Sequence, residues 1–134
     1  MDRQIGGITL RELLGAGLLV LLLLLGLLSA WYLNRQSSAM AAALEDSSWL
    51  ALSGQWENAK EMSASVRQDW EKGWRLRAAF ADHANLEEID GLFREMMIYG
   101  AADERTEFSR TSALLAEKMK AMADSARFSW WNVL

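Results

Sequence analysis

The residues with the clearest chemical potential lie in a short polar block around the single histidine, His83. On one continuous helix, His83, Glu87 and Asp90 would share a face at positions i, i+4 and i+7, and these side chains are possible ligands for a divalent metal. Asn85, however, is a typical N-cap residue with Glu88 three positions after it, so we expect a helix to begin there. That start would leave His83 in the connection before the helix and break the shared face.

A structural role accounts for the same block without a bound metal. Asp82 and Asn85 are suited to accept hydrogen bonds from first-turn N–H groups, and the acids that follow favour the positive end of a helix. The chain has no cysteine and no second histidine, so a metal would need carboxylates from another helix. We therefore predict no metal-binding, cofactor-binding or catalytic residue, and we assign Asp82, His83, Glu87 and Asp90 to a candidate interaction surface.

Tryptophans offer a second possible site. Trp56, Trp70 and Trp74 recur at helical spacing and, together with His83, could line a pocket for a small ligand. Indoles at this spacing belong more often to a core than to a binding site, because they bury a large apolar area. We predict that they are core residues.

The chain ends in an apolar segment, residues 128–134, which contains Trp130 and Trp131. An exposed segment of this kind would aggregate, so we expect it to pack back onto the protein. A partner's groove and the membrane interface are the alternatives. Trp130 and Trp131 complete the candidate interaction surface.

The composition excludes several classes of protein. A chain of 134 residues without cysteine has no disulfide, no thiolate nucleophile and no iron–sulfur cluster, and it is too short for two domains and a membrane segment. Residues 36–134 hold eleven basic and sixteen acidic residues, a net charge of −5 that would be repelled by phosphate backbones. Nucleic acid is therefore not an expected partner.

An uncharged run from Leu13 to Asn34 predicts a membrane span. As a helix it would extend about 33 Å, which matches a hydrocarbon core of about 30 Å. A cleaved signal peptide is the alternative, but cleavage after Ala30 would place the bulky Leu28 three positions before the cut. Basic residues before the span outnumber those after it, which favours a cytoplasmic N-terminus and residues 36–134 on the outer side.

The remainder predicts an all-α fold, because proline is absent and helix-forming residues are plentiful. Amphipathic patterns predict helices over about 55–81, from Asn85 to a cap at Gly100, and over about 102–126. Joined by short loops, they should form a small antiparallel bundle of three to four helices. The predicted organisation is a short cytoplasmic segment (1–12), a transmembrane helix (13–34), a stalk helix (35–53) and a bundle domain with an apolar tail (54–134).

Several segments together carry a resemblance to a known family. They are the single N-terminal span, the segment from Gly54 to Lys60, the apolar end, and a polar block. The residues of the block that match the family's pattern are Phe80, Asp82, His83, Leu86, Ile89 and Asp90. This order resembles domain of unknown function family 4363. The resemblance implies a small single-span membrane protein of endospore-forming Gram-positive bacteria, with a helical bundle. It implies no catalytic role for any residue.

We therefore expect a non-enzymatic, membrane-anchored interaction module in the bacterial cell membrane. Its bundle would lie outside the cytoplasm and bind another envelope protein or itself, while the span contacts lipid. A small-ligand sensor is the main alternative. A metal-assisted enzyme that uses His83, Glu87 and Asp90 is a more remote one.

Overall fold

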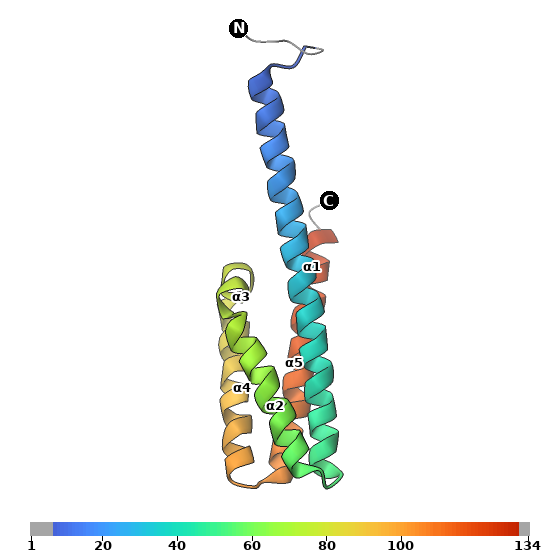
Figure 1. Ribbon diagram of the computed structural model, residues 1–134. Coiled ribbons are helices and arrows are strands. Elements are labelled where there is room, and N and C mark those ends of the chain that lie inside the picture. The colour runs from blue at the N-terminus through green and yellow to red at the C-terminus, as the bar shows by residue number, and fades with distance from the viewer. Residues whose placement is uncertain (1–6, 132–134) are drawn as a thin grey trace. The chain divides into compact units, whose positions relative to one another are not determined.

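The computed structural model of the protein describes residues 7–131, without the side chains of Phe80 and residues 126–131. The described residues form five helices: α1 (Leu10–Leu52), α2 (Trp56–Lys72), α3 (Trp74–Phe80), α4 (His83–Ala101) and α5 (Arg105–Trp131) (Figure 1). This part of the chain contains no strand, which confirms the predicted all-α class.

The chain divides into two compact units, Met1–Tyr32 and Leu33–Leu134, and the division falls inside α1. α1 continues through the boundary without a break. The helix ends at Leu52, close to the end that the sequence predicts for the segment 35–53.

In the first unit, α1 begins with a reciprocal cap. The backbone N–H of Thr9 donates to the carboxylate of Glu12 at 3.0 Å, and the N–H of Glu12 donates to the Thr9 hydroxyl at 3.3 Å. This capping box satisfies donors that the helix leaves free and starts α1 at Leu10 rather than Leu13. The apolar side chains that follow are exposed, and α1 is the helix among the described residues that is long and apolar enough to cross a membrane.

The second unit is an antiparallel bundle of four helical segments: residues 33–52 of α1, then α2 with α3, then α4, then α5 (Figure 1). Connections of two or three residues join them, which makes consecutive helices antiparallel neighbours. Gly54 reverses the chain between α1 and α2 with φ +88°, a conformation open to glycine, and Asp103 takes φ 56° between α4 and α5.

Side chains from all four segments form the bundle core. The buried apolar residues are Met40, Ala41, Leu44 and Ala51 of α1, Trp56, Ala59, Val66 and Trp70 of α2, Leu86, Ile89, Phe93 and Met96 of α4, and Phe108, Leu115, Ala116 and Met119 of α5. The sequence predicted that residues 35–53 form a stalk helix apart from the bundle, but these residues contribute side chains to its core. They are its first helix, because alanine and serine at helical spacing give this segment a face that packs closely on its neighbours.

Buried hydroxyls join α1 to the helices beside it. Ser112 of α5 donates to the carbonyl of Leu44 at 2.7 Å, and Ser47 donates to the carbonyl of Ala59 in α2 at 2.8 Å. Ser48 and Ser109 meet at 2.8 Å, and the hydroxyl of each also lies within hydrogen-bond distance of the other's carbonyl. Small side chains let the backbones approach, and the hydrogen bonds satisfy the polar groups that this approach buries.

Three predicted helix boundaries are wrong. The helix expected over 55–81 is interrupted at Gly73, which ends α2 and precedes α3. Gly100 is not a cap but a buried residue in the last turns of α4, where the ring of Phe108 lies close to it. The last helix begins at Arg105 and its backbone continues to Trp131, five residues beyond the predicted end.

Candidate functional site

The polar block around His83 lies at the start of α4. Asp82, not Asn85, is the N-cap, and its carboxylate accepts a hydrogen bond from the N–H of Ala84 at 3.1 Å. His83 is therefore the first residue of the helix. The capping pattern at Asn85 had predicted that His83 lies in the connection before the helix, and that prediction is wrong. Asp82 has an extended backbone, and its carboxylate reaches an N–H group two residues ahead in the first turn of α4. The helix therefore begins three residues before the start that a cap at Asn85 would give.

Asp82 precedes α4, and His83, Glu87 and Asp90 lie on it at positions i, i+4 and i+7, so the helix start at His83 restores the shared face that a start at Asn85 would have broken. His83 and Glu87 are exposed, and Asp90 lies 3.5 Å from Arg94 in an ion pair on the same helix. Within residues 7–131, no group of three or more histidine, aspartate or glutamate side chains is placed to hold a metal ion. Trp130 and Trp131, the other two members of the predicted surface, have side chains outside the described residues.

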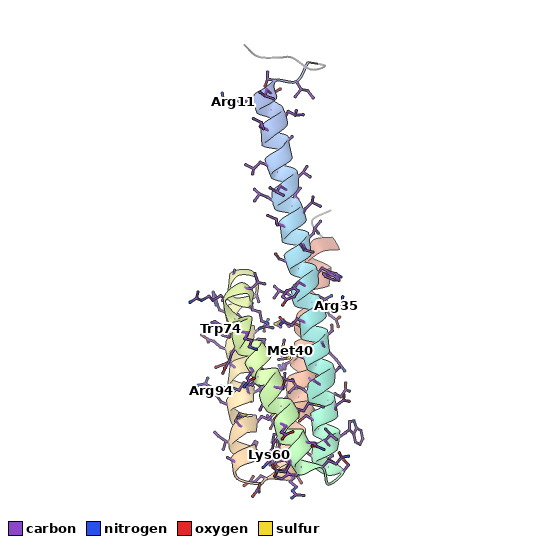
Figure 2. All side chains as sticks on the ribbon, in the orientation of Figure 1. Arg11, Arg35, Met40, Lys60, Trp74 and Arg94 are labelled. Atoms are coloured by element: carbon purple, nitrogen blue, oxygen red, sulfur yellow. The ribbon has the colours of Figure 1, made fainter. Side chains whose placement is uncertain are left out.

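Two of the three tryptophans are core residues, as predicted. Trp70 is 1% exposed, with its ring 5.8 Å from that of Phe93. Trp56 packs edge-on against Phe108 at 4.9 Å. Trp74 differs: it lies at the edge of the bundle, 37% exposed, with its ring 6.0 Å from that of Trp70 (Figure 2).

Trp56 is also held by polar neighbours near the α1–α2 connection. Its indole N–H donates to the carboxylate of Asp103 at 2.9 Å. The ammonium of Lys60 and the guanidinium of Arg105 lie 5.2 and 5.5 Å from the ring, within the range of cation–π attraction (Figure 2). These contacts fix the indole as a structural anchor between the two loops at this end of the bundle.

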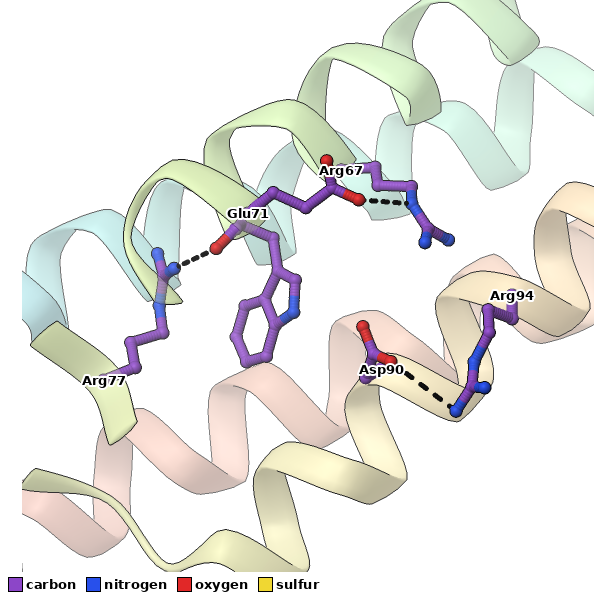
Figure 3. Close-up of polar contacts among 6 residues, drawn as sticks. Arg67, Glu71, Arg77, Asp90 and Arg94 are labelled. Atoms are coloured by element: carbon purple, nitrogen blue, oxygen red, sulfur yellow. Dashed lines mark hydrogen bonds and ion pairs between the residues drawn. The ribbon is translucent and has the colours of Figure 1, made fainter. Parts of the chain in front are cut away.

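The sequence did not single out Arg77, which is 1% exposed inside the bundle. Its guanidinium donates to the carbonyl of Trp70 at 2.7 Å (Figure 3) and lies 4.6 Å from the Trp70 ring. It also donates to the amide oxygen of Gln36 at 2.7 Å. Buried charge is costly unless hydrogen bonds replace water, and these bonds join α1, α2 and α3. One signal was present in the sequence: Arg77 falls in phase with the apolar stripe of Val66 and Trp70.

Arg77 also explains the break at Gly73. A methyl group at Gly73 would overlap the guanidinium, so any other residue at this position would require the Arg77 side chain to move. Nearby, Arg67 pairs with Glu71 at 3.0 Å on α2, and Asp90 pairs with Arg94 at 3.5 Å on α4 (Figure 3). The buried indole N–H of Trp70 has no hydrogen-bond partner among the described residues.

A groove of about 620 Å³ lies between α1 and α2 in the second unit. Its lining combines apolar or small residues with a few polar ones: Gln36, Ala39, Met40, Ala43 and Leu50 of α1, and Asn58, Glu61, Met62, Ser65, Val66 and Asp69 of α2. A second, smaller groove of about 280 Å³ lies between α4 and α5, beside Asn85 and Lys118. Neither of these two grooves is lined by Trp56, Trp70, Trp74 or His83.

Large apolar side chains also remain exposed on the bundle surface. Trp49 is 69% exposed and Leu52 is 59% exposed on the last turns of α1, three residues apart and hence on one face. We call these two residues the Trp49 patch. Nothing in the local sequence marks Trp49 as exposed, because the burial of Ser47 and Ser48 beside it depends on the neighbouring helices.

Among the described residues, the phenol of Tyr99 has a shifted pKa. The phenol of Tyr99 donates a hydrogen bond to the carboxylate of Glu95 at 3.1 Å. This bond to a negative acceptor, with smaller contributions from burial and from the charges of Glu95 and Glu107, raises the pKa of Tyr99 above its ordinary value.

The fold defines a class: a helical bundle preceded by one helix of membrane-spanning length and composition. Residues 27–133 match the domain of unknown function DUF4363, and the chain belongs to this family. No curated protein and no solved structure matches the chain. The family match confirms the resemblance and runs from the end of the apolar run through the whole bundle.

Proposed function

We propose that the protein is a non-enzymatic interaction module of the bacterial cell membrane. The first part of α1 anchors it, and its helical bundle binds another envelope protein or a second copy of the chain. The N-terminus is cytoplasmic and the bundle lies on the outer side, because Arg3 and Arg11 precede the apolar run while Arg35 is the one basic residue close after it.

The observation that carries this proposal is the Trp49 patch. Among the described residues, Trp49 is the most exposed large apolar side chain at 69%, and Leu52 on the same face is 59% exposed; Ile98 of α4 is exposed to a similar degree, at 66%. Contiguous exposed apolar groups mark interaction sites, and tryptophan is enriched among the residues that dominate binding energy. The exposed candidates at the start of α4, Asp82, His83 and Glu87, are a second, polar part of the surface.

Photo-cross-linking in cells tests the proposal. A photoreactive phenylalanine analogue replaces Trp49 in the tagged full-length protein, and a matched variant carries it at Glu117, an exposed polar position on α5. We expect one recurring product from position 49 and none from position 117. The proposal fails if position 49, and a further variant at His83, give no product above that of position 117.

A truncation separates binding from folding. Because Trp49 is exposed, Trp49→Ala should change the free energy of unfolding by no more than about 0.5 kcal/mol. The same variant should abolish cross-linking from a probe at position 52. A loss of stability of several kcal/mol would show that Trp49 is structural and that the patch is not an interaction site.

The orientation has a direct test, because the natural chain contains no cysteine. A single cysteine introduced at Ser53, which is exposed beyond the end of α1, should react with a membrane-impermeant thiol reagent in intact cells. A single cysteine at Thr9 should react only after the membrane is opened. The reverse pattern would overturn the assigned topology.

A further inference from the structure

The groove between α1 and α2 has the dimensions of a helix-binding site. On α1 it extends from Gln36 to Leu50, about 21 Å along the helix, which is close to four turns. Its floor is apolar, since Met40 and Val66 are 3% and 4% exposed. Figure 1 shows α2 running obliquely beside the second half of α1, and the groove is lined by side chains of these two helices.

The groove lining suits a helical occupant more than a rigid small molecule. Ala39 and Ala43 lie one turn apart on the α1 wall, and such small residues let the backbone of another helix approach closely. Met40 and Met62 supply flexible apolar side chains that adapt to a partner's surface. These are the features of grooves that accept the apolar face of an amphipathic helix.

Charge on the α2 wall specifies the occupant further. Glu61 and Asp69 are both exposed at the groove, and neither forms an ion pair with another described residue. Other acids of α2 are neutralised: Glu57 pairs with Lys60 and Glu71 pairs with Arg67. Since the lining includes no basic residue, the groove presents two unneutralised carboxylates, eight residues and about 12 Å apart along α2.

We propose that the α1–α2 groove binds a helix of a different protein, with an apolar stripe flanked by two lysine or arginine residues about two turns apart. This proposal rests on the proposed function and names the chemistry of the partner. A second copy of the chain fits less well. Residues 36–134 carry a net charge of −5, so two copies repel each other, and three basic residues of α5, Arg110, Lys118 and Lys120, are already paired with acids.

A charge-swap experiment with defined peptides tests the proposal. One synthetic amphipathic helix carries an alanine, leucine and methionine stripe with lysines seven positions apart, and a matched peptide carries glutamates at those two positions. Each is titrated against the full-length protein in neutral detergent micelles, and binding is followed by fluorescence anisotropy of the labelled peptide. We expect the lysine peptide to bind at least about tenfold more tightly.

Two protein variants give the experiment its specificity. The double substitution Glu61→Lys with Asp69→Lys should reverse the preference, so that the glutamate peptide becomes the tighter ligand. The control, Glu104→Lys with Glu117→Lys, makes the same change in net charge at exposed positions outside the groove and should leave the preference unchanged. A third variant, Ala43→Trp, should weaken both peptides because it fills the groove.

Each contrary outcome has a defined meaning. Equal binding of the two peptides, no binding, or a preference that the control variant also reverses would overturn the groove proposal. A product of twice the protein's mass from a photoreactive probe at Met62 would assign the groove to a second copy instead. Cross-linking at Trp49 without peptide binding in the groove would overturn this inference alone, whereas the absence of a product from both position 49 and position 83 would overturn the proposed function.

Discussion

α1 is one helix with two different environments. Residues 13–28 are almost uniformly leucine, and their large side chains remain 47–66% exposed. Residues 33–52 contain few leucines, yet Ser37, Ala41, Leu44 and Ser48 follow one another at three- or four-residue spacing and are all buried. The comparison shows that apolar content and burial are separate properties. A uniform surface suits a lipid environment on every side, whereas a periodic stripe of small residues marks a face that packs on other helices.

The strongest test of this contrast is the same substitution in each half of the helix. Leu44→Ala removes a side chain that is 0% exposed, and the cavity should lower the free energy of unfolding of the bundle by about 2–5 kcal/mol. Leu22→Ala removes a side chain that is 58% exposed and should change it by no more than about 0.5 kcal/mol. Urea unfolding in micelles, followed by tryptophan fluorescence, measures both. Equal losses would contradict the division of α1 into two environments.

Glycines sharpen the comparison. An added methyl group at Gly73 would collide with the buried guanidinium of Arg77, so Gly73→Ala should destabilise the bundle by about 1–3 kcal/mol. Gly17→Ala, in the apolar half of α1, meets nothing within 4 Å and should be neutral. In an Arg77→Ala background the cost of Gly73→Ala should vanish. If that cost persists in the double variant, Arg77 is not the reason for the glycine.

Buried hydroxyls give a smaller effect. Ser112→Ala removes the hydrogen bond to the carbonyl of Leu44 and should lower the free energy of unfolding by about 0.5–1.5 kcal/mol. Ser38→Ala changes an exposed serine of α1 and serves as the matched control. Thermal unfolding monitored by circular dichroism compares the two variants. A larger loss from Ser38→Ala would mean that the α1–α5 contact is not held through Ser112.

Much of the fold was predictable because helical periodicity reports which face of a segment is buried. The pattern through Trp56, Val66 and Trp70 is an example, and so is the break at Gly54. Periodicity failed at residues 35–53, where serine and alanine supply the buried face. Their small size makes the packing tight, but it also leaves little hydrophobic signal in the sequence.

The candidate sites were less predictable for a different reason. Asp82 and Asn85 are both good N-caps, and the choice between them depends on where the backbone turns after α3. The α1–α2 groove arises from the angle between two helices, and no short motif encodes that angle. The spacing of Arg77 from Val66 and Trp70 placed it on the buried face of the helix. A charged residue is not expected at a buried position, and the hydrogen bonds to Gln36 and to the Trp70 carbonyl that make it possible could not be predicted from the sequence.

The smallest effect concerns Tyr99, a partly buried residue of α4 that packs against the bundle core and so contrasts with the exposed apolar side chains of the first unit. Its hydrogen bond to Glu95 raises its pKa, so the phenol should titrate above the ordinary value of about 10. Because the pKa is raised on folding, the stabilisation is present at neutral pH and is lost as the pH rises through the folded pKa. Tyrosinate absorbance in a Tyr32→Phe background measures this titration, since Tyr32 and Tyr99 are the two tyrosines of the chain.

The variant Glu95→Gln removes the main cause of the raised pKa and should return the titration midpoint of Tyr99 toward the ordinary value. A midpoint that is unchanged by Glu95→Gln would assign the shift to burial and to Glu107 instead, and would leave the hydrogen bond without a role in holding this face of α4.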